Sequence, residues 1–413
     1  MYENLVNQSI TKNLVNDIKT KTFPGAVLFC GPESAGKLTA ALETSRILSC
    51  HEKTPGKWTC NCYNCRQQKA LTFSNLLLLG PRDCALEISA SKQTFLNAVK
   101  QNASFLNATH YLFVRSIRKL TLRFNGILCE GDKNLNKIGN IIEEINENLE
   151  KIDVNTEHKL PPYDDLEKIC SVLEALSLKL ENEYLYDSIP INQIRNMEDW
   201  AYKKSDYGKK TIILENADRM SLNVRNALLK ILEEPPEDCI FILLSSKRNA
   251  IMQTILSRVR TYNFCERTKE QQKDVISRVF HNDNSDLTIN EYLQTFLPIH
   301  PKKIQEMAQL FLKSICERKI PDIDYIVQTC GKFSPRIELR LFLSYLATLQ
   351  KKMIYSQAGA ESSAKVMNYL RECYDNITLY NQNVNSALEN LLREISLINV
   401  QNEGIFSVII SND

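Results

Sequence analysis

Short apolar runs alternate with amphipathic stretches along much of the first 265 residues. Four runs have the length and composition of buried strands: 26–30, 76–79, 211–215 and 240–246. A further strand is expected just after Arg258. Apolar residues recur at helical spacing over 37–49 and 222–232, and Pro235 and Pro236 end the second of these helices. Strands that alternate with helices predict a parallel α/β sheet.

Segment 82–187 interrupts this alternation. It carries three ladders of apolar residues at heptad-like spacing, over 99–127, 135–152 and 166–180. From Ile88 to Cys129 there are six basic residues and no acid, and acids predominate from there on. We therefore expect three helices in an antiparallel hairpin or small bundle, with the basic helix against the acidic ones. We expect this insertion to project from the sheet, and its pattern requires no chemistry of its own.

Past residue 265 the strand pattern ends. The remaining apolar spacing predicts five helices: 266–280, 301–317, 334–356, 361–374 and 383–397. The C-terminal part is therefore expected to be all-α and to form more than one unit.

Overall charge gives no argument for nucleic-acid binding. The 413 residues include 51 basic and 49 acidic ones, a formal net charge of +2. There is no apolar run of 18 residues, and the N-terminal residues are polar, so we expect a soluble, cytoplasmic protein whose 13 cysteines are mostly reduced.

Four of the cysteines are clustered. Cys50, Cys60, Cys62 and Cys65 follow the spacing C-x9-C-x-C-x2-C within a polar segment. Four thiolates so close in sequence are typical of a tetrahedral zinc site, and nothing nearby suggests an open catalytic position, so the zinc would be structural. Two alternatives stay open here: His51 as a substitute ligand, or a chance clustering of buried cysteines.

The segment 31–39, GPESAGKLT, follows an expected strand and opens an expected helix. In this context Gly31, Ser34 and Gly36 would place backbone amides around phosphate oxygens, and Lys37 would add a positive charge. A complete loop of this kind has a hydroxyl directly after the lysine to bind magnesium. Here that residue is Leu38, and Thr39 comes one position late. The alternative is a strand-to-helix turn whose glycines serve geometry alone.

A second departure follows the strand 211–215. An ATPase of this type needs a metal-binding acid there and a carboxylate that activates water. Glu215 can serve the first purpose, but the next residue is Asn216, whose amide is no base. Leu38 and Asn216 together indicate a site without hydrolytic chemistry.

The order of these segments closely resembles bacterial DNA polymerase III clamp-loader subunits of the AAA+ superfamily. The resemblance rests on FPGAVLFCGPESAGK (23–37), the cysteine cluster, NADRMSLNVRNALLKILEEPP (216–236) and TILSR (254–258). Within that group, the altered loop, the Glu215-Asn216 pair and the retained Ser257-Arg258 resemble the delta prime type. The resemblance implies that Arg258 is an arginine finger acting in trans on a neighbouring gamma/tau subunit, and that Ser245 and Ser246 lie at the sensor-1 strand end.

The fold implied by the resemblance is an α/β AAA+ (RecA-like P-loop) domain over 1–265, containing the zinc module 50–65 and the insertion 82–187. All-α lid (266–318) and collar (319–413) domains would follow. Implied nucleotide contacts are Gly31, Ser34, Gly36, Lys37, Thr39, Glu215 and Ser246. The implied function is that of a non-hydrolysing subunit, working with gamma/tau, delta, the sliding clamp and primed DNA. An active gamma/tau-type ATPase and an interaction scaffold with a vestigial pocket are the alternatives.

Overall fold

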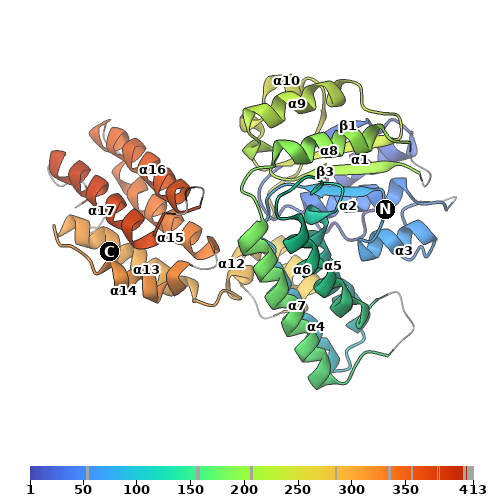
Figure 1. The fold of residues 1–413 in the computed structure, drawn as a ribbon, viewed down its shortest axis with the longest axis horizontal. Coiled ribbons are helices and arrows are strands. Elements are labelled where there is room, and N and C mark those ends of the chain that lie inside the picture. The colour runs from blue at the N-terminus through green and yellow to red at the C-terminus, as the bar shows by residue number, and fades with distance from the viewer. Residues whose placement is uncertain are drawn as a thin grey trace. The chain divides into compact units, whose positions relative to one another are not determined.

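The computed structural model describes residues 1–52, 55–154, 159–204, 208–283, 286–333, 336–354, 357–378, 380, 382–402 and 406. The chain divides into two compact units, Met1–Leu293 and Gln294–Asp413 (Figure 1). None of the described helices is both long and apolar enough to span a bilayer.

The first unit is built on a five-stranded sheet with the order β2-β3-β4-β1-β5, in which every neighbouring pair is parallel. The strands are β1 (Ala26–Cys30), β2 (Leu76–Leu79), β3 (Lys210–Leu214), β4 (Cys239–Ser245) and β5 (Arg260–Asn263). The predicted parallel α/β sheet is confirmed, and every expected strand is present within one residue of its expected ends, where such ends were given.

Both faces of the sheet are covered, so its strands are apolar along their whole length. Alternate residues of β1 show this: Leu28 belongs to one apolar core and Val27 and Phe29 to the other. The first core includes α8 (Ile191–Tyr202) and α9 (Leu222–Glu233), and the second includes α1 (Thr11–Lys19) and α2 (Lys37–Leu48). The other helices of the unit outside the insertion are α3 (Tyr63–Ala70), α10 (Gln253–Leu256), α11 (Lys269–Phe280) and α12 (Ile289–Gln294).

The insertion contains four α-helices in the described residues, not the expected three. They are α4 (Ala85–Lys100), α5 (Leu106–Thr121) with a 3-10 turn η1 (Leu122–Phe124), α6 (Leu135–Glu150) and α7 (Tyr163–Tyr184). The first ladder, 99–127, corresponds to α5 and η1, and α4 is the helix that no ladder predicted. Asn102, with a left-handed φ of 46°, lies between α4 and α5, and the two helices pack against each other. The four helices lie together on one side of the sheet (Figure 1). They share one apolar core.

Basic side chains of α5 attach the insertion to the α/β core. Arg115 donates to the carbonyl oxygens of Gln68 (3.2 Å) and Lys69 (2.6 Å), and Arg118 donates to that of Ala70 (2.7 Å). These carbonyls belong to the last turn of α3, where a helix leaves carbonyl oxygens in need of partners, and the Gln68 carbonyl also accepts from the N–H group of Leu71 at 3.2 Å. The insertion is therefore joined to the core and does not only project from it.

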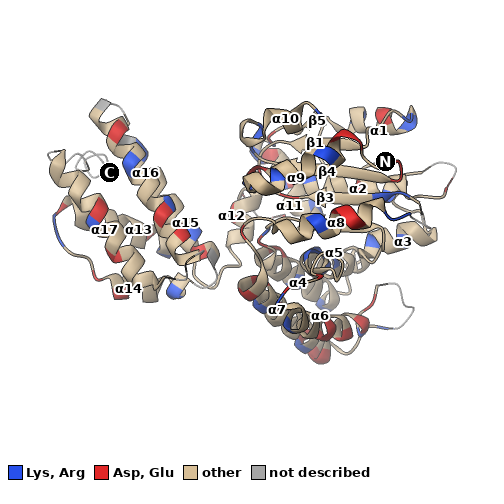
Figure 2. Ribbon diagram, turned by 45° about the horizontal axis from the view of Figure 1, so that its top comes forward, with Lys and Arg blue, Asp and Glu red and all other residues tan. Residues whose placement is uncertain are grey.

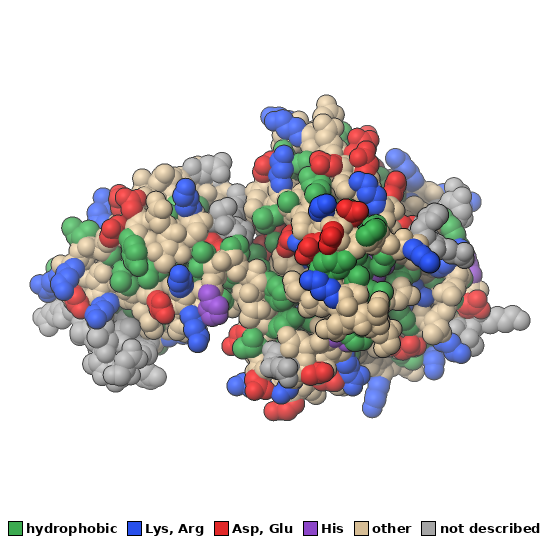
Figure 3. Space-filling view, turned by 90° about the horizontal axis from the view of Figure 1, so that it is seen from below, with side chains coloured by type: hydrophobic (Ala, Val, Ile, Leu, Met, Phe, Trp, Pro, Cys, Tyr) green, Lys and Arg blue, Asp and Glu red, His purple; other side chains and the backbone are tan. Residues whose placement is uncertain are grey.

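The expected pairing of basic with acidic helices is confirmed in part. Lys92 of α4 pairs with Glu174 of α7 at 2.8 Å, whereas Lys119 of α5 pairs with Glu87 of α4. Acidic residues lie along α6 and α7 (Figure 2). On the faces seen in Figure 3, basic and acidic side chains are interspersed and neither sign forms one large patch.

A buried carboxylate links the last helix of the insertion, α7, to the start of its first helix, α4. Glu181 of α7 accepts hydrogen bonds from the backbone N–H groups of Cys84 (2.7 Å) and Ala85 (3.0 Å), at the start of α4. Burial, with Asp83 nearby, raises the pKa of Glu181 to about 8, although the two hydrogen bonds oppose this. The protonated form is thus favoured in the folded state.

We expect the stability of the first unit to depend on pH through this residue. The contribution of Glu181 is complete below the ordinary glutamate pKa and is lost as pH rises towards about 8, which amounts to a few kcal/mol at most. Glu181→Gln should flatten the decline in melting temperature between about pH 5 and pH 8. Glu183→Gln, at an exposed position of the same helix, is the control, and equal pH profiles for wild type and Glu181→Gln would contradict the assignment.

The second unit is all-α in its described residues, as predicted. Its helices are α13 (Pro301–Cys316), α14 (Ile323–Thr329), α15 (Arg336–Leu349), α16 (Gln357–Thr378) and α17 (Val384–Gln401). All except α14 were expected, and they share one apolar core. The lid and collar boundaries expected at residues 265 and 318 stay predictions.

Candidate functional site

The loop 31–39 connects β1 to α2 and needs both of its glycines. A Cβ atom on Gly31 would lie 2.4 Å from the carbonyl oxygen of Phe264, which the backbone cannot accommodate. Gly36 precedes the first residue of α2 with a left-handed φ of 89°. The N–H groups at the start of α2 are therefore presented to the loop, as phosphate binding requires.

The ammonium group of Lys37 lies within this loop. Its Nζ donates to the carbonyl oxygens of Gly31 (2.6 Å) and Pro32 (2.5 Å), and burial lowers the pKa of Lys37. Ser34 Oγ donates to Oδ1 of Asn290, in α12, at 2.6 Å. The structure thus brings Gly31, Ser34 and Lys37 into one loop, as expected.

Leu38 has a role in packing. Its side chain is buried in the core between the sheet and α2, while Thr39 is half-buried one position later. The position where a complete phosphate loop has its metal-binding hydroxyl is therefore part of the apolar core.

Glu215 lies directly after β3, on the same edge of the sheet as the loop. Its side chain is 8% exposed, and its Oε1 accepts a hydrogen bond from Arg82 Nη1 at 2.8 Å. Its Oε2 accepts from Arg123 Nη2, and Arg123 belongs to η1 of the insertion. Both oxygens of the expected metal-binding carboxylate thus face guanidinium groups.

Neighbouring polar residues complete this edge. Asn216 has a left-handed φ of 51°, and its Nδ2 donates to the carbonyl oxygen of Pro81 at 2.5 Å. Ser245 Oγ donates to Asp218 Oδ1 at 2.7 Å, whereas Ser246, the predicted contact, is half-buried just after β4.

Arg258 lies at the opposite end of the sheet from the loop, near the amino ends of the strands. It precedes β5, whose first residue Arg260 pairs with Val27 near the amino end of β1, whereas the loop 31–39 follows the carboxyl end of β1. The Arg258 guanidinium donates to Glu233 Oε2 (2.9 Å) and to the carbonyl oxygen of Thr254 (2.8 Å), with 27% of the side chain exposed. The structure does not bring it together with the other predicted site residues.

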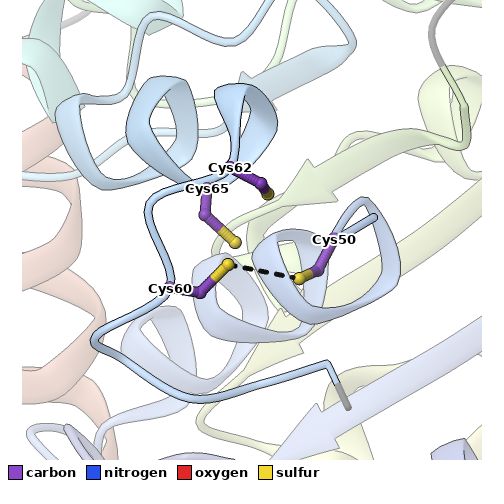
Figure 4. A group of neighbouring side chains, drawn as sticks. All are labelled: Cys50, Cys60, Cys62 and Cys65. Atoms are coloured by element: carbon purple, nitrogen blue, oxygen red, sulfur yellow. Dashed lines mark hydrogen bonds between the residues drawn. The ribbon is translucent and has the colours of Figure 1, made fainter. Parts of the chain in front are cut away.

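The four clustered cysteines do come together. The Sγ atoms of Cys50, Cys60, Cys62 and Cys65 all lie within 4.8 Å of one another, and those of Cys50 and Cys60 are 3.7 Å apart (Figure 4). A tetrahedral site with Zn–S bonds of about 2.3 Å has S···S edges of about 3.8 Å. The thiols therefore fit a zinc ion without rearrangement of the backbone.

Cations and an aromatic ring surround this cluster. Arg46 donates to Cys65 Sγ at 3.3 Å, and Lys69 donates to the carbonyl oxygen of Cys60 at 2.8 Å. Both cations also lie over the Trp58 ring, at 5.4 and 5.3 Å from its centroid. Arg46 is also paired with the buried Glu43, so Lys69 is the cation that would offset the net negative charge of a zinc ion held by four thiolates. His51 is exposed and its Nε2 contacts Asn64 at 2.9 Å, which favours Cys60 over His51 as the fourth ligand.

The family described as "DNA polymerase III, delta subunit" matches residues 6–268, which is more than half of the chain. The chain belongs to this family. The resemblance drawn from the sequence motifs is thereby confirmed, and the sheet, the loop and the cysteine cluster all lie within the matched residues.

Relatives in the family match over shorter segments. DNA polymerase III subunit delta' of Pseudomonas aeruginosa is 34% identical over 22% of this chain and 29% of its own length. Subunit tau of Bacillus subtilis is 33% identical over 27% of this chain and 20% of its own, and subunit delta' of the same organism is 36% identical over 21% and 26%. The chain thus matches about a quarter of the length of these relatives.

Two residues that contact Glu215 were not predicted from the sequence. Arg82 and Arg123 hold the oxygens of Glu215 from 133 and 92 residues away in the chain. No local motif marks them. The only signal in the sequence was the excess of basic residues over 88–129, which includes Arg123 but not Arg82.

We expect about one zinc ion per chain, measured by elemental analysis of protein that has not been exposed to chelators. Cys60→Ser should lose most of the zinc and lower the melting temperature, because a structural zinc contributes directly to folding. Cys265→Ser, at an exposed cysteine outside the cluster, should keep the metal. Folded wild-type protein without zinc would show that the cluster is not a metal site.

Proposed function

We propose that the chain is a non-hydrolysing clamp-loader subunit of the delta prime type within the DNA polymerase III holoenzyme. Family membership supports the clamp-loader assignment. The observation that carries the non-hydrolysing role is the state of Glu215, because both of its oxygens face arginine side chains. Leu38 in the core and Asn216 in place of a base agree with it.

Arg258 would act on a neighbouring subunit. It lies at the edge of the sheet opposite the loop 31–39, so its own loop is out of reach, and it is partly exposed. An arginine supplied in trans stabilises the charge that develops on a transferred phosphoryl group. A gamma/tau subunit is the proposed recipient.

The other assignments follow from this role. Zinc at the four cysteines would be structural, nucleotide would contact the loop 31–39 with Ser246 nearby, and 266–318 and 319–413 would form the lid and the collar. The collar would hold the chain in a hetero-oligomer with gamma/tau and delta subunits. The assembly would place a sliding clamp on primed DNA.

Two other functions remain as alternatives. An active gamma/tau-type ATPase is favoured by the similarity to subunit tau over 120 residues. An interaction scaffold with a vestigial pocket is favoured by the insertion, whose arginines enter that pocket. Reconstitution with gamma/tau, delta, clamp and primed DNA separates these functions, because only the proposed one requires Arg258 but not Lys37 for the ATPase of its neighbour.

The isolated chain should show no ATP hydrolysis above background. The structure offers neither a hydroxyl after Lys37 nor a base after Glu215. Steady-state phosphate release is the measurement, and Lys37→Ala is the control. Turnover near ~1 s⁻¹, at the low end of enzyme rates, that disappears in Lys37→Ala would favour the ATPase alternative.

A further inference from the structure

The insertion contributes a buried cation to the edge of the sheet that carries the loop 31–39. Arg123 is 0% exposed, and each part of its guanidinium is engaged. Its Nε donates to the carbonyl oxygen of Gly80 at 2.9 Å, its Nη1 to that of Lys119, and its Nη2 to Glu215 Oε2. The arginine is therefore held in place by the core on one side and by its own helix on the other.

A second guanidinium covers the other oxygen of Glu215. Arg82 donates from Nη1 to Glu215 Oε1 at 2.8 Å and from Nη2 to Glu87 Oε2 at 3.1 Å. Burial alone would raise the pKa of Glu87, but Lys119 and Arg82 lower it to about 2, so Glu87 is ionised. This cluster therefore contains two carboxylates and three cations and has a net charge of +1. Its members are Glu87, Glu215, Arg82, Lys119 and Arg123.

This cluster lies at the same end of the sheet as the phosphate loop. Parallel strands end at one edge of the sheet, and only β4 separates β1, before the loop, from β3, before Glu215. The Lys37 ammonium is close enough to interact electrostatically with both Glu215 and Arg82. A ligand held by Lys37 in the loop would therefore lie within electrostatic range of the cluster.

We propose that Arg82 and Arg123 take the place of a divalent cation beside the loop 31–39, so that the phosphates of a nucleotide bind there without a metal ion. A magnesium ion needs direct oxygen ligands in octahedral geometry, and the Glu215 oxygens already accept charge-assisted hydrogen bonds. Arginine keeps its charge at all ordinary pH values, so the positive charge beside Glu215 is permanent. The inference rests on the proposed nucleotide-binding loop but not on the finger role of Arg258.

The test measures ATP affinity in excess MgCl2 and in excess EDTA, together with Mn²⁺ binding by electron paramagnetic resonance. Wild type should bind ATP equally in both buffers, within about twofold, and should hold no Mn²⁺ at Glu215. Arg82→Met, at a side chain that is 34% exposed, should gain an Mn²⁺ site and bind ATP roughly tenfold more tightly with magnesium, a change of ~1.4 kcal/mol. Adding Glu215→Gln should abolish both gains.

Arg82→Met/Arg123→Met should show larger gains if it folds, and Arg118→Met, whose guanidinium bonds the Ala70 carbonyl, should behave as wild type. Wild type that binds no ATP in either buffer would overturn the inference. Mg²⁺-dependent ATP binding by wild type, or a folded Arg82→Met without a new Mn²⁺ site, would overturn the inference. Failure of the proposed function is a different result, because it appears as ATP turnover by the isolated chain.

Discussion

Arg258→Ala should assemble into a reconstituted clamp loader and yet lower its clamp- and DNA-stimulated ATPase. At the one site that receives this arginine, loss of an arginine finger is expected to cost about 10³–10⁵ in rate, by comparison with GTPases. Sites with fingers from gamma/tau subunits should keep working. The total ATPase should therefore fall only in part, and clamp loading should fall more.

The geometry explains why the loss should fall on a neighbour. Arg258 lies at the amino edge of the sheet, and the described residues it contacts include Glu233, which is itself 60% exposed. An exposed ion pair of this kind contributes about 0–1 kcal/mol, so the arginine can leave Glu233 for a phosphate at little cost. Arg258→Ala should for the same reason leave the stability of the chain almost unchanged.

Three further variants sharpen this test. Glu233→Gln removes the partner of Arg258 in the free chain and should not lower the ATPase. Lys230→Ala, at an exposed position of α9, controls for loss of surface charge. Arg258→Lys should rescue little, because an ammonium lacks the planar fork of donors that spans two oxygens. A fully assembled Arg258→Ala complex with wild-type ATPase and loading rates would reject the finger role.

The sheet could be predicted from the sequence because its strands are buried on both faces. Such strands are uninterrupted apolar runs, as in the four leucines of β2, and their ends are marked by glycine or polar residues. The cysteine cluster could be predicted for a similar reason, since its ligands lie within 16 residues of one another. In both cases the information is local.

Local sequence patterns did not predict every helix. The missed helices include ones that are short or polar. Helix α3, YNCRQQKA, has no apolar stripe, and α14 has only seven residues. The first ladder begins at residue 99, one residue before α4 ends, so the apolar spacing predicted α5 but not α4. The contacts of Arg82 and Arg123 with Glu215 are set by how the insertion docks, which no spacing within the insertion reveals.

Arg123→Met should destabilise the first unit by roughly 3–5 kcal/mol at neutral pH, the usual cost of breaking a buried ion pair. The substitution leaves Glu215 8% exposed and held by Arg82 alone, and it removes the donor that satisfies the Gly80 carbonyl. Urea unfolding followed by tryptophan fluorescence measures this, since Trp58 and Trp200, the two tryptophans of the chain, lie in the first unit.

The charge on Glu215, and not the lost packing, should account for most of this effect. Glu215→Gln introduced into Arg123→Met removes the buried charge and should recover a large part of the stability, although Glu215→Gln alone destabilises the wild type. Arg118→Met is the matched control, because it deletes an arginine of α5 that bonds a neutral carbonyl, worth about 0.5–1.5 kcal/mol. Two results would show that the Arg123–Glu215 ion pair does not hold the insertion to the sheet. One is an Arg123→Met variant that loses no more free energy of unfolding than Arg118→Met, and the other is a lack of recovery with Glu215→Gln. A large coupling between the two positions would instead show that the insertion holds the edge of the sheet through this one pair of charges.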